Sequence, residues 1–139
     1  MAAHRLILDS GVLIAIERGR LDLASISPDD ADVVVPAIVV AEFMVGVELA
    51  ATDRQRHARQ AFLDHVLRAL PIEPYGERVA VEHAKLLAHV HRTGQKRGAH
   101  DLIIAAISVA TKRTVVTTDN RAKFDELPSV SAKLITVSP

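Results

Sequence analysis

Short runs of β-branched and aliphatic residues alternate along this chain with longer segments whose apolar residues recur every three or four positions. The first pattern predicts buried strands, and the second predicts helices that cover them. The predicted strands are residues 5–8, 33–35, 70–72, 114–117 and 134–137, and the predicted helices are residues 12–17, 53–70, 77–91 and 101–111. Regular alternation of this kind is typical of an α/β layer structure with a mainly parallel sheet.

One long segment, residues 37–50, fits both patterns. Its Ile38-Val39-Val40 favours a strand by propensity, whereas its length and the spacing of Phe43 and Val47 favour a helix. The chain has 139 residues, the usual size of one domain, and it shows no internal repeat, low-complexity tract or linker. We therefore expect a single domain over residues 1–139.

Composition narrows the setting in which the chain works. There is no apolar run of about eighteen residues or more, and no charged-then-apolar leader, so we expect neither a membrane span nor a secretion signal. Cysteine is absent, which excludes disulfides and zinc–thiolate sites and fits a reducing cytoplasm. Seventeen basic and seventeen acidic residues cancel, so net charge does not indicate a nucleic-acid partner.

Four acidic residues stand where apolar strand-like runs give way to helix-like runs. These are Asp9, Glu42, Asp101 and Asp119, which follow or open the segments at 5–8, 33–35, 101–111 and 114–117. The carboxyl ends of parallel strands share one edge of the sheet, where open α/β sheets bind ligands. We therefore expect the four carboxylates to converge from distant parts of the chain.

Converging carboxylates predict a metal site. They repel one another, and a divalent cation relieves that repulsion. Mg²⁺ or Mn²⁺ is the expected cofactor because these ions prefer oxygen ligands and retain several waters. Such an ion polarises a phosphate oxygen and lowers the pKa of a bound water. The pattern thus predicts phosphate chemistry.

Each acid also has a structural interpretation. Asp9 and Asp101 could cap helices, and Asp119 could be a turn residue. Glu42 is harder to explain in this way, because it lies within an apolar run where an unpaired charge is costly. The hydroxyl of Ser10 could orient a metal-bound water or help to cap the helix, and both alternatives stay open.

A basic stripe between Lys85 and His100 contains four Lys or Arg residues, three His and no acid. It could be a solvated helix face, or it could hold a polyanion beside the metal centre. The candidate RNA contacts are Arg92, Lys96, Arg97 and His100. Arg97 is the preferred phosphate contact because of its place in the predicted loop. His65 and His83 fall on predicted inward faces, where core histidines are expected.

The motifs around the four acids resemble those of the PIN-domain ribonucleases, and more narrowly of the VapC toxins of bacterial toxin–antitoxin pairs. The matching segments are Asp9-Ser10-Gly11-Val12-Leu13-Ile14, Glu42-Phe43-x-x-Gly46 after Pro36, Asp101-Leu102-Ile103-Ile104-Ala105-Ala106, and Thr117-Thr118-Asp119 followed by Phe124. Together they cover essentially the full chain, in the order of the family.

The resemblance implies a three-layer α/β/α domain with a five-stranded, mainly parallel sheet. It implies Mg²⁺ or Mn²⁺ held by the four acids with Ser10 and Thr117 in support, and endonucleolytic cleavage of RNA. An antitoxin partner and a homodimer are further expectations. Some members carry another acid directly after the fourth one, where this chain has Asn120 and Arg121.

Four other functions are alternatives for a small α/β domain. An aspartyl-nucleophile phosphatase needs a second Asp two positions after the first, where this chain has Gly11. A phospho-acceptor signalling domain needs paired acids after the first strand, and Asp9 stands alone. A non-catalytic binding module, in which the acids are only caps, is distinguished by its failure to bind Mn²⁺. A PIN-type nuclease outside a toxin–antitoxin pair is the remaining alternative.

Overall fold

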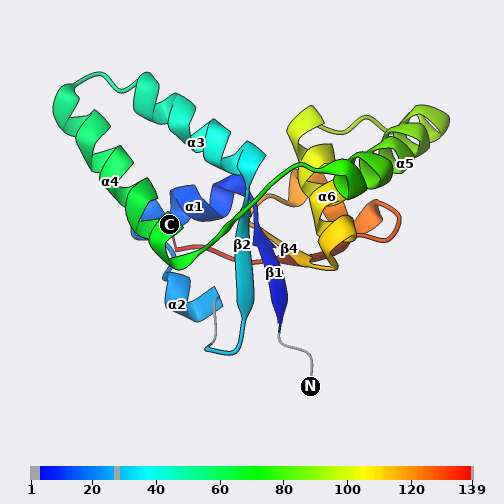
Figure 1. Cartoon of the computed structure of the whole chain (residues 1–139), viewed down its shortest axis with the longest axis horizontal. Helices are drawn as coiled ribbons and strands as arrows, with labels where there is room; N and C mark the ends of the chain where they lie inside the picture. Colours follow the sequence, from blue (N-terminus) through cyan, green and yellow to red (C-terminus); the bar gives the residue numbers. More distant parts are fainter. Residues whose placement is uncertain (1–3, 27–28, 139) are drawn as a thin grey trace.

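A computed structural model describes residues 4–26 and 29–138, and its centre is one five-stranded sheet, whose central strands are labelled in Figure 1. The strands are β1 (Arg5–Leu8), β2 (Asp32–Pro36), β3 (Ile72–Glu73), β4 (Thr114–Thr117) and β5 (Ser131–Leu134). All neighbours pair in parallel, in the order β3-β2-β1-β4-β5. The predicted parallel α/β architecture is thereby confirmed.

The central strands are apolar on both faces because helices cover both. Ile7 and Leu8 of β1 and Val35 of β2 are fully buried, as is Val115 of β4. The last strand is different: the prediction of 134–137 is wrong, since β5 ends at Leu134. As an edge strand with mostly exposed side chains, β5 is held by backbone bonds to β4 and not by an apolar run.

The helices are α1 (Ser10–Glu17), α2 (Leu23–Ile26), α3 (Ala37–Glu48), α4 (Asp53–Ala69), α5 (Glu77–Thr93) and α6 (Ala99–Thr111), with 3₁₀ turns at Asn120–Ala122 and Phe124–Glu126. The ambiguous segment after β2 is therefore a helix. Pro36 is its N-cap, and Val39, Val40, Phe43 and Val47 are buried at helical spacing. Burial of one helical face outweighs the strand propensity of its β-branched residues.

The direction of winding reverses at the centre of the sheet. The chain passes from β1 outward to β2 and β3, and then crosses back through α5 and α6 to β4 on the other side of β1. In Figure 1, α3 and α4 stand to the left of the central strands and α5 and α6 to the right. The right-handed rule for parallel crossovers places these two groups on opposite faces. The switch point lies between β1 and β4, where α/β proteins form their sites.

Helix faces were predicted less well than helix positions. On α4 the structure buries Val66, which fits the predicted spacing, and Leu63, which does not, whereas His65 is exposed. His65 is therefore not a core histidine. His83 is half-buried, and its Nδ1 lies 2.9 Å from the hydroxyl of Tyr75, so it has a hydrogen-bond partner as expected but does not lie in the core.

Arg59 of α4 connects three helices, because it contacts α1 and α3 as well. Its Nε and one terminal nitrogen donate to the Glu17 carboxylate at the end of α1, at 3.0 and 3.2 Å. Its guanidinium lies 4.7 Å from the centre of the Phe43 ring, which favours a cation–π contact. A Cβ at Gly46 would collide with this guanidinium. Gly46 thus allows α4 to approach α3, and the clamp fixes the helix that carries Glu42.

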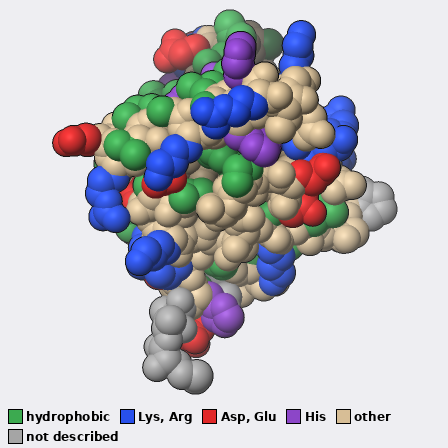
Figure 2. All heavy atoms as spheres, turned by 90° about the vertical axis from the view of Figure 1, so that its right-hand side faces the viewer, with side chains coloured by type: hydrophobic (Ala, Val, Ile, Leu, Met, Phe, Trp, Pro, Cys, Tyr) green, Lys and Arg blue, Asp and Glu red, His purple; other side chains and the backbone are tan. Residues whose placement is uncertain are grey.

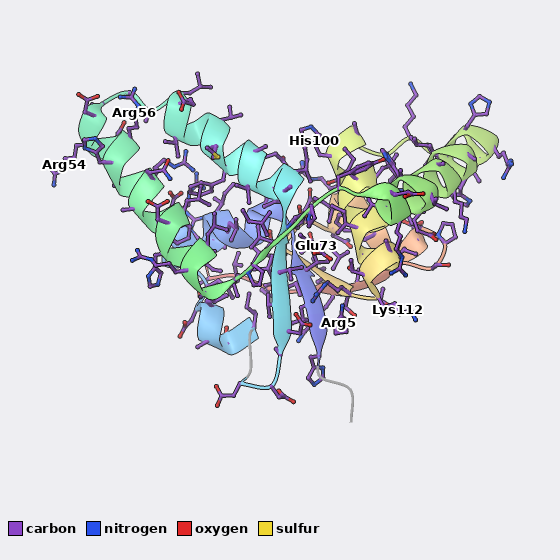
Figure 3. The ribbon with its side chains drawn as sticks, viewed as in Figure 1. Arg5, Arg54, Arg56, Glu73, His100 and Lys112 are labelled. Carbon is purple, nitrogen blue, oxygen red and sulfur yellow. The ribbon has the colours of Figure 1, made fainter. Side chains whose placement is uncertain are left out.

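A second ion-pair network lies at the amino end of strands β1 and β2, where Figure 3 labels Arg5. Arg113 is buried and donates to the Asp32 carboxylate and to the Asp32 carbonyl, both at 2.9 Å. The hydrogen bond from Arg113 holds the pKa of Asp32 below its usual range. Arg5 donates to the same carboxylate at 2.8 Å from an exposed position.

Replacing the buried Arg113 with Met is expected to lower the free energy of unfolding by about 2 kcal/mol, because the half-buried carboxylate and carbonyl of Asp32 lose their donor. Urea unfolding measures this change. The Arg5→Ala variant is the matched control and is expected to cost less than about 1 kcal/mol, as exposed pairs do. Equal effects of the two substitutions would contradict the conclusion that the buried Arg113 matters more than the exposed Arg5.

The effect of the Arg113 substitution is also expected to depend on pH. The pKa of Asp32 is lowered in the folded state, so ionised Asp32 stabilises the fold at a pH above the pKa of the unfolded chain. This stabilisation, and with it the effect of removing Arg113, should shrink as the pH falls through the pKa that Asp32 has in the folded state.

Within residues 4–26 and 29–138, no helix combines the length and the apolar character needed to cross a bilayer.

Candidate metal centre

Three of the four predicted acids meet at the carboxyl edge of the sheet. Asp9 directly follows β1, Asp119 follows the neighbouring β4, and Asp101 lies in the first turn of α6. They line one open hollow of about 560 Å³, whose other lining residues are Ser10, Gly11, Ile14, Thr118, Asn120 and Arg121. The parallel pairing of β1 with β4 brings together acids that are more than a hundred residues apart in the chain.

Asp9 is the most buried of the acids, with 5% of its surface exposed. It caps α1, and its Oδ1 accepts from the backbone N–H of Ser10 at 2.7 Å. Its Oδ2 accepts from the hydroxyl of Thr117 at 2.9 Å, and that hydroxyl also accepts from the backbone N–H of Asp119 at 3.0 Å. Thr117 therefore ties two of the acids to each other. Burial raises the pKa of Asp9 despite these hydrogen bonds.

Asp101 has no hydrogen-bond partner among the described residues. Its helix begins at Ala99 with Gly98 as N-cap, so its predicted alternative role as a cap is wrong. Burial raises its pKa, and the negative charges of Asp9, Asp119 and Glu42 raise it further. An unpaired, half-buried carboxylate among other carboxylates is costly without a cation.

Asp119 is bound differently. Its Oδ1 accepts from the backbone N–H of Arg121 at 2.9 Å and from the side-chain Nε of the same residue at 3.1 Å. The backbone hydrogen bond, followed by the arginine side chain, holds the pKa of Asp119 below its usual range. The sequence allows Asp119 to be a turn residue; in the structure it is the N-cap of the 3₁₀ turn at Asn120–Ala122, and it also lines the acidic hollow. Its second oxygen makes no hydrogen bond with any described residue.

Glu42 approaches from α3. Its Oε2 lies 3.5 Å from Nδ1 of His100, while its Oε1 is buried without a hydrogen-bond partner. Glu42 is the sixth residue of α3 and therefore lies beyond its first turn. The macrodipole acts mainly over the first turn, and it therefore contributes little here. An orphaned buried carboxylate oxygen is costly unless a cation or a donor reaches it.

The donor set suits a hard divalent cation. It consists of carboxylate oxygens, several of which lack a protein partner. In addition to burial, the negative charges of the neighbouring carboxylates raise the pKa of Asp101. Among the described residues, no three acidic or histidine side chains lie close enough to form a ready cage. Mg²⁺ commonly binds through one or two carboxylates and several waters, which fits an open edge of this kind.

The predicted RNA contacts are not gathered at this hollow. Arg97 is half-buried, and its guanidinium turns back onto the carbonyls of Gln95 and Lys96. Arg92 and Lys96 are exposed at the end of α5 and in the following loop. Only His100, on the first turn of α6, reaches one of the acids (Figure 3). Figure 2, which looks onto the right-hand side of Figure 1, shows cations separated by apolar and neutral side chains instead of one stripe.

Five residues that line the hollow were not among the predicted site residues: Gly11, Ile14, Thr118, Asn120 and Arg121. Arg121 pairs with Asp119, and Thr118 packs so closely that a Cβ at Gly11 would lie 2.5 Å from its hydroxyl oxygen. Gly11 is therefore the residue that lets the start of α1 approach β4. A signal for Arg121 was present, because an Asp that caps a short helical turn faces the second residue after it. The hydroxyl of Ser10 lies beside Asp9 and slightly lowers the pKa of that carboxyl; its role toward a metal-bound water stays a prediction.

The chain matches known proteins over nearly its whole length. The PIN domain model matches residues 6–129. Ribonuclease VapC5 of Mycobacterium tuberculosis is 34% identical over 82% of both chains, and Ribonuclease VapC of Rickettsia bellii is 27% identical over 90% of this chain and 92% of the relative. VapBC-5 from M. tuberculosis, a member of a family of toxin–antitoxin systems, superposes with a TM-score of 0.76 at 28% identity, covering 94% of this chain and 98% of the other.

A second solved structure, VapBC2 from Rickettsia felis bound to promoter DNA, has a TM-score of 0.85 and covers 95% of this chain and 99% of the other. At 20% identity it supports the fold alone. The family match covers most of the chain, and the order of strands and acids agrees with it. The chain belongs to the PIN domain family, and among its members it is related to the VapC ribonucleases.

Proposed function

We propose that this chain is a metal-dependent endoribonuclease and the toxin of a toxin–antitoxin pair. The carrying observation is the convergence of Asp9, Asp101 and Asp119 on one open hollow at the switch point, with Glu42 beside it. The relatives named ribonuclease cover both chains almost fully and supply the substrate class. We further infer that residues 1–139 form one domain that acts in the cytoplasm.

The acids have separate roles in this mechanism. Asp9, Asp101 and Asp119 would hold the Mg²⁺ or Mn²⁺ ion, and Thr117 keeps Asp9 and the backbone of Asp119 in place. When bound, the cation would lower the pKa of a water and neutralise charge on the scissile phosphate. The unpartnered Oε1 of Glu42 is the oxygen available to orient the attacking water or to accept its proton.

The partner expected is an antitoxin protein, in keeping with the solved toxin–antitoxin complex at 28% identity. Met44 and Val45 of α3 and its C-cap residue Leu49 expose apolar side chains on the outside of this helix. Exposed apolar groups gathered on one helix are typical of a protein-binding surface. We infer that this outer face serves the antitoxin or the second subunit of a homodimer.

Cleavage of RNA is expected to require Mg²⁺ or Mn²⁺ and to stop when EDTA is added, because the unscreened carboxylates repel the phosphate. Water, and not the ribose 2′-hydroxyl, is the nucleophile, so the products should carry no 2′,3′-cyclic phosphate. Gel electrophoresis of end-labelled RNA, with and without metal, measures both properties. Cleavage that persists in EDTA, or cyclic-phosphate ends, would overturn the metal mechanism. A failure to bind Mn²⁺ would favour the non-catalytic module.

A further inference from the structure

The acidic hollow contains one cation that the mechanism above does not use. Among the described residues that line it, Arg121 alone is basic, and it stands beside Asp9, Asp101 and Asp119. We propose that Arg121 binds a backbone phosphate of the RNA that occupies this site. The inference rests on the proposed function, since it concerns the substrate of the same site.

The first support is the way Arg121 is anchored. Its Nε donates to Oδ1 of Asp119 at 3.1 Å, while its side chain is 93% exposed. The two terminal nitrogens make no hydrogen bond with any residue that the structure describes. A guanidinium that is tethered through Nε still presents a pair of donors, and paired donors match the geometry of a phosphate.

The second support is that stability does not require this side chain. The backbone N–H of Arg121 already satisfies the cap at Asp119. An ion pair whose arginine is almost fully exposed contributes little to the free energy of folding. The position of the guanidinium at the rim of the acidic hollow is therefore better explained by a ligand than by the fold.

The third support is the state of the other candidate cations. Arg97 directs one terminal nitrogen onto the carbonyls of its own loop, and His100 faces Glu42. Neither lines the hollow that Asp9, Asp101 and Asp119 share. An RNA backbone entering this hollow brings negative charge toward several carboxylates. A cation at the rim offsets that charge for phosphates next to the one being cut.

The test compares Arg121→Ala and Arg121→Lys with the wild-type chain. The control is Arg56→Ala, which also removes one arginine from an acid pair, with Asp53, but lies far away on α4 (Figure 3). Binding of a short, labelled single-stranded RNA of mixed sequence is measured by fluorescence anisotropy over a range of salt, with Ca²⁺ replacing Mg²⁺. Mn²⁺ affinity is measured separately by calorimetry.

Arg121→Ala is expected to weaken RNA binding about tenfold and to reduce the slope of log Kd against log salt by roughly 0.7. Arg121→Lys should keep the slope and lose part of the affinity, and Arg56→Ala should match the wild type. Mn²⁺ binding by Arg121→Ala should be unchanged or tighter, because a competing cation has been removed from Asp119.

Two results would overturn the inference alone. One is wild-type RNA affinity and salt slope in Arg121→Ala. The other is a loss of Mn²⁺ affinity in that variant, which would mean that Arg121 acts only by holding Asp119. Absence of metal-dependent RNA cleavage by the wild-type chain would instead overturn the proposed function, and the inference with it.

Discussion

Replacing Asp101 with Asn is expected to reduce RNA cleavage by about a hundred- to a thousandfold while leaving the fold intact. The negative charges of Asp9, Asp119 and Glu42 all repel the ionised carboxylate of Asp101, and this side chain has no hydrogen bond among the described residues. A neutral amide of the same shape holds a divalent cation poorly. Initial rates of cleavage at saturating Mg²⁺, together with circular dichroism, measure the two parts of this expectation.

The same substitution is expected to stabilise the metal-free protein at neutral pH. Burial and neighbouring charges raise the folded pKa of Asp101 above its usual 3.8. A pKa that is raised in the folded state means that the protonated Asp101 carboxyl is more compatible with the fold than the ionised one. The folded state is therefore unpenalised at a pH below the pKa of the unfolded chain, and it loses stability as the pH rises through the pKa of the folded chain. The melting temperature of Asp101→Asn in EDTA should therefore exceed that of the wild type at pH 7, and this difference should vanish below about pH 3.8.

Added Mn²⁺ should reverse the order of stability. The cation binds the folded wild type and raises its melting temperature by mass action, and the variant should respond much less. The matched control is Asp125→Asn, which removes a carboxylate outside the acidic hollow. Undiminished cleavage by Asp101→Asn, or equal stabilisation of both proteins by Mn²⁺, would contradict the metal assignment.

The second large effect is expected at Thr117, where Val should lower cleavage roughly 10- to 100-fold and the free energy of unfolding by about 2 kcal/mol. Thr117 is 4% exposed, and its hydroxyl donates to Asp9 and accepts from the backbone of Asp119. Val has nearly the same shape but leaves both groups without their partner. Steady-state kinetics and urea unfolding measure these effects.

Thr117→Val is also expected to shift the pH dependence of cleavage. The hydrogen bond from Thr117 lowers the pKa of Asp9 against the effect of burial. Without that bond the pKa rises further, and ionised Asp9 is required to hold the cation, so the acid limb of the rate profile should move to higher pH. Thr117→Ser retains the hydroxyl and should restore most activity and the original limb. Identical pH profiles of the Val and Ser variants would contradict this role.

Local pattern predicted the positions of most elements. The bounds of β1 and β4 were predicted correctly, because short β-branched runs that end in turn signals allow few alternatives. The sequence predicted less well which face of a helix is buried, because packing against other helices decides this. Leu63 of α4 is buried and Ala61 is exposed, and only the helices that lie against α4 determine which of its faces is covered. At the edge strand β5, pairing with β4 mattered more than the apolar run that follows it.

The sequence by itself determined the parallel α/β architecture, since the period of its apolar residues changes from strand to helix along the chain. It also determined the place of the acids, because residues that follow parallel strands share one edge. Only the tertiary structure decided which groups meet there: the hydroxyl of Thr117 bonds to Asp9, His100 lies beside Glu42, and one oxygen of Glu42 is left without a partner. Hydrogen bonds between residues far apart in the chain depend on the pairing of β1 with β4 and on the docking of α3. No local pattern encodes those distances.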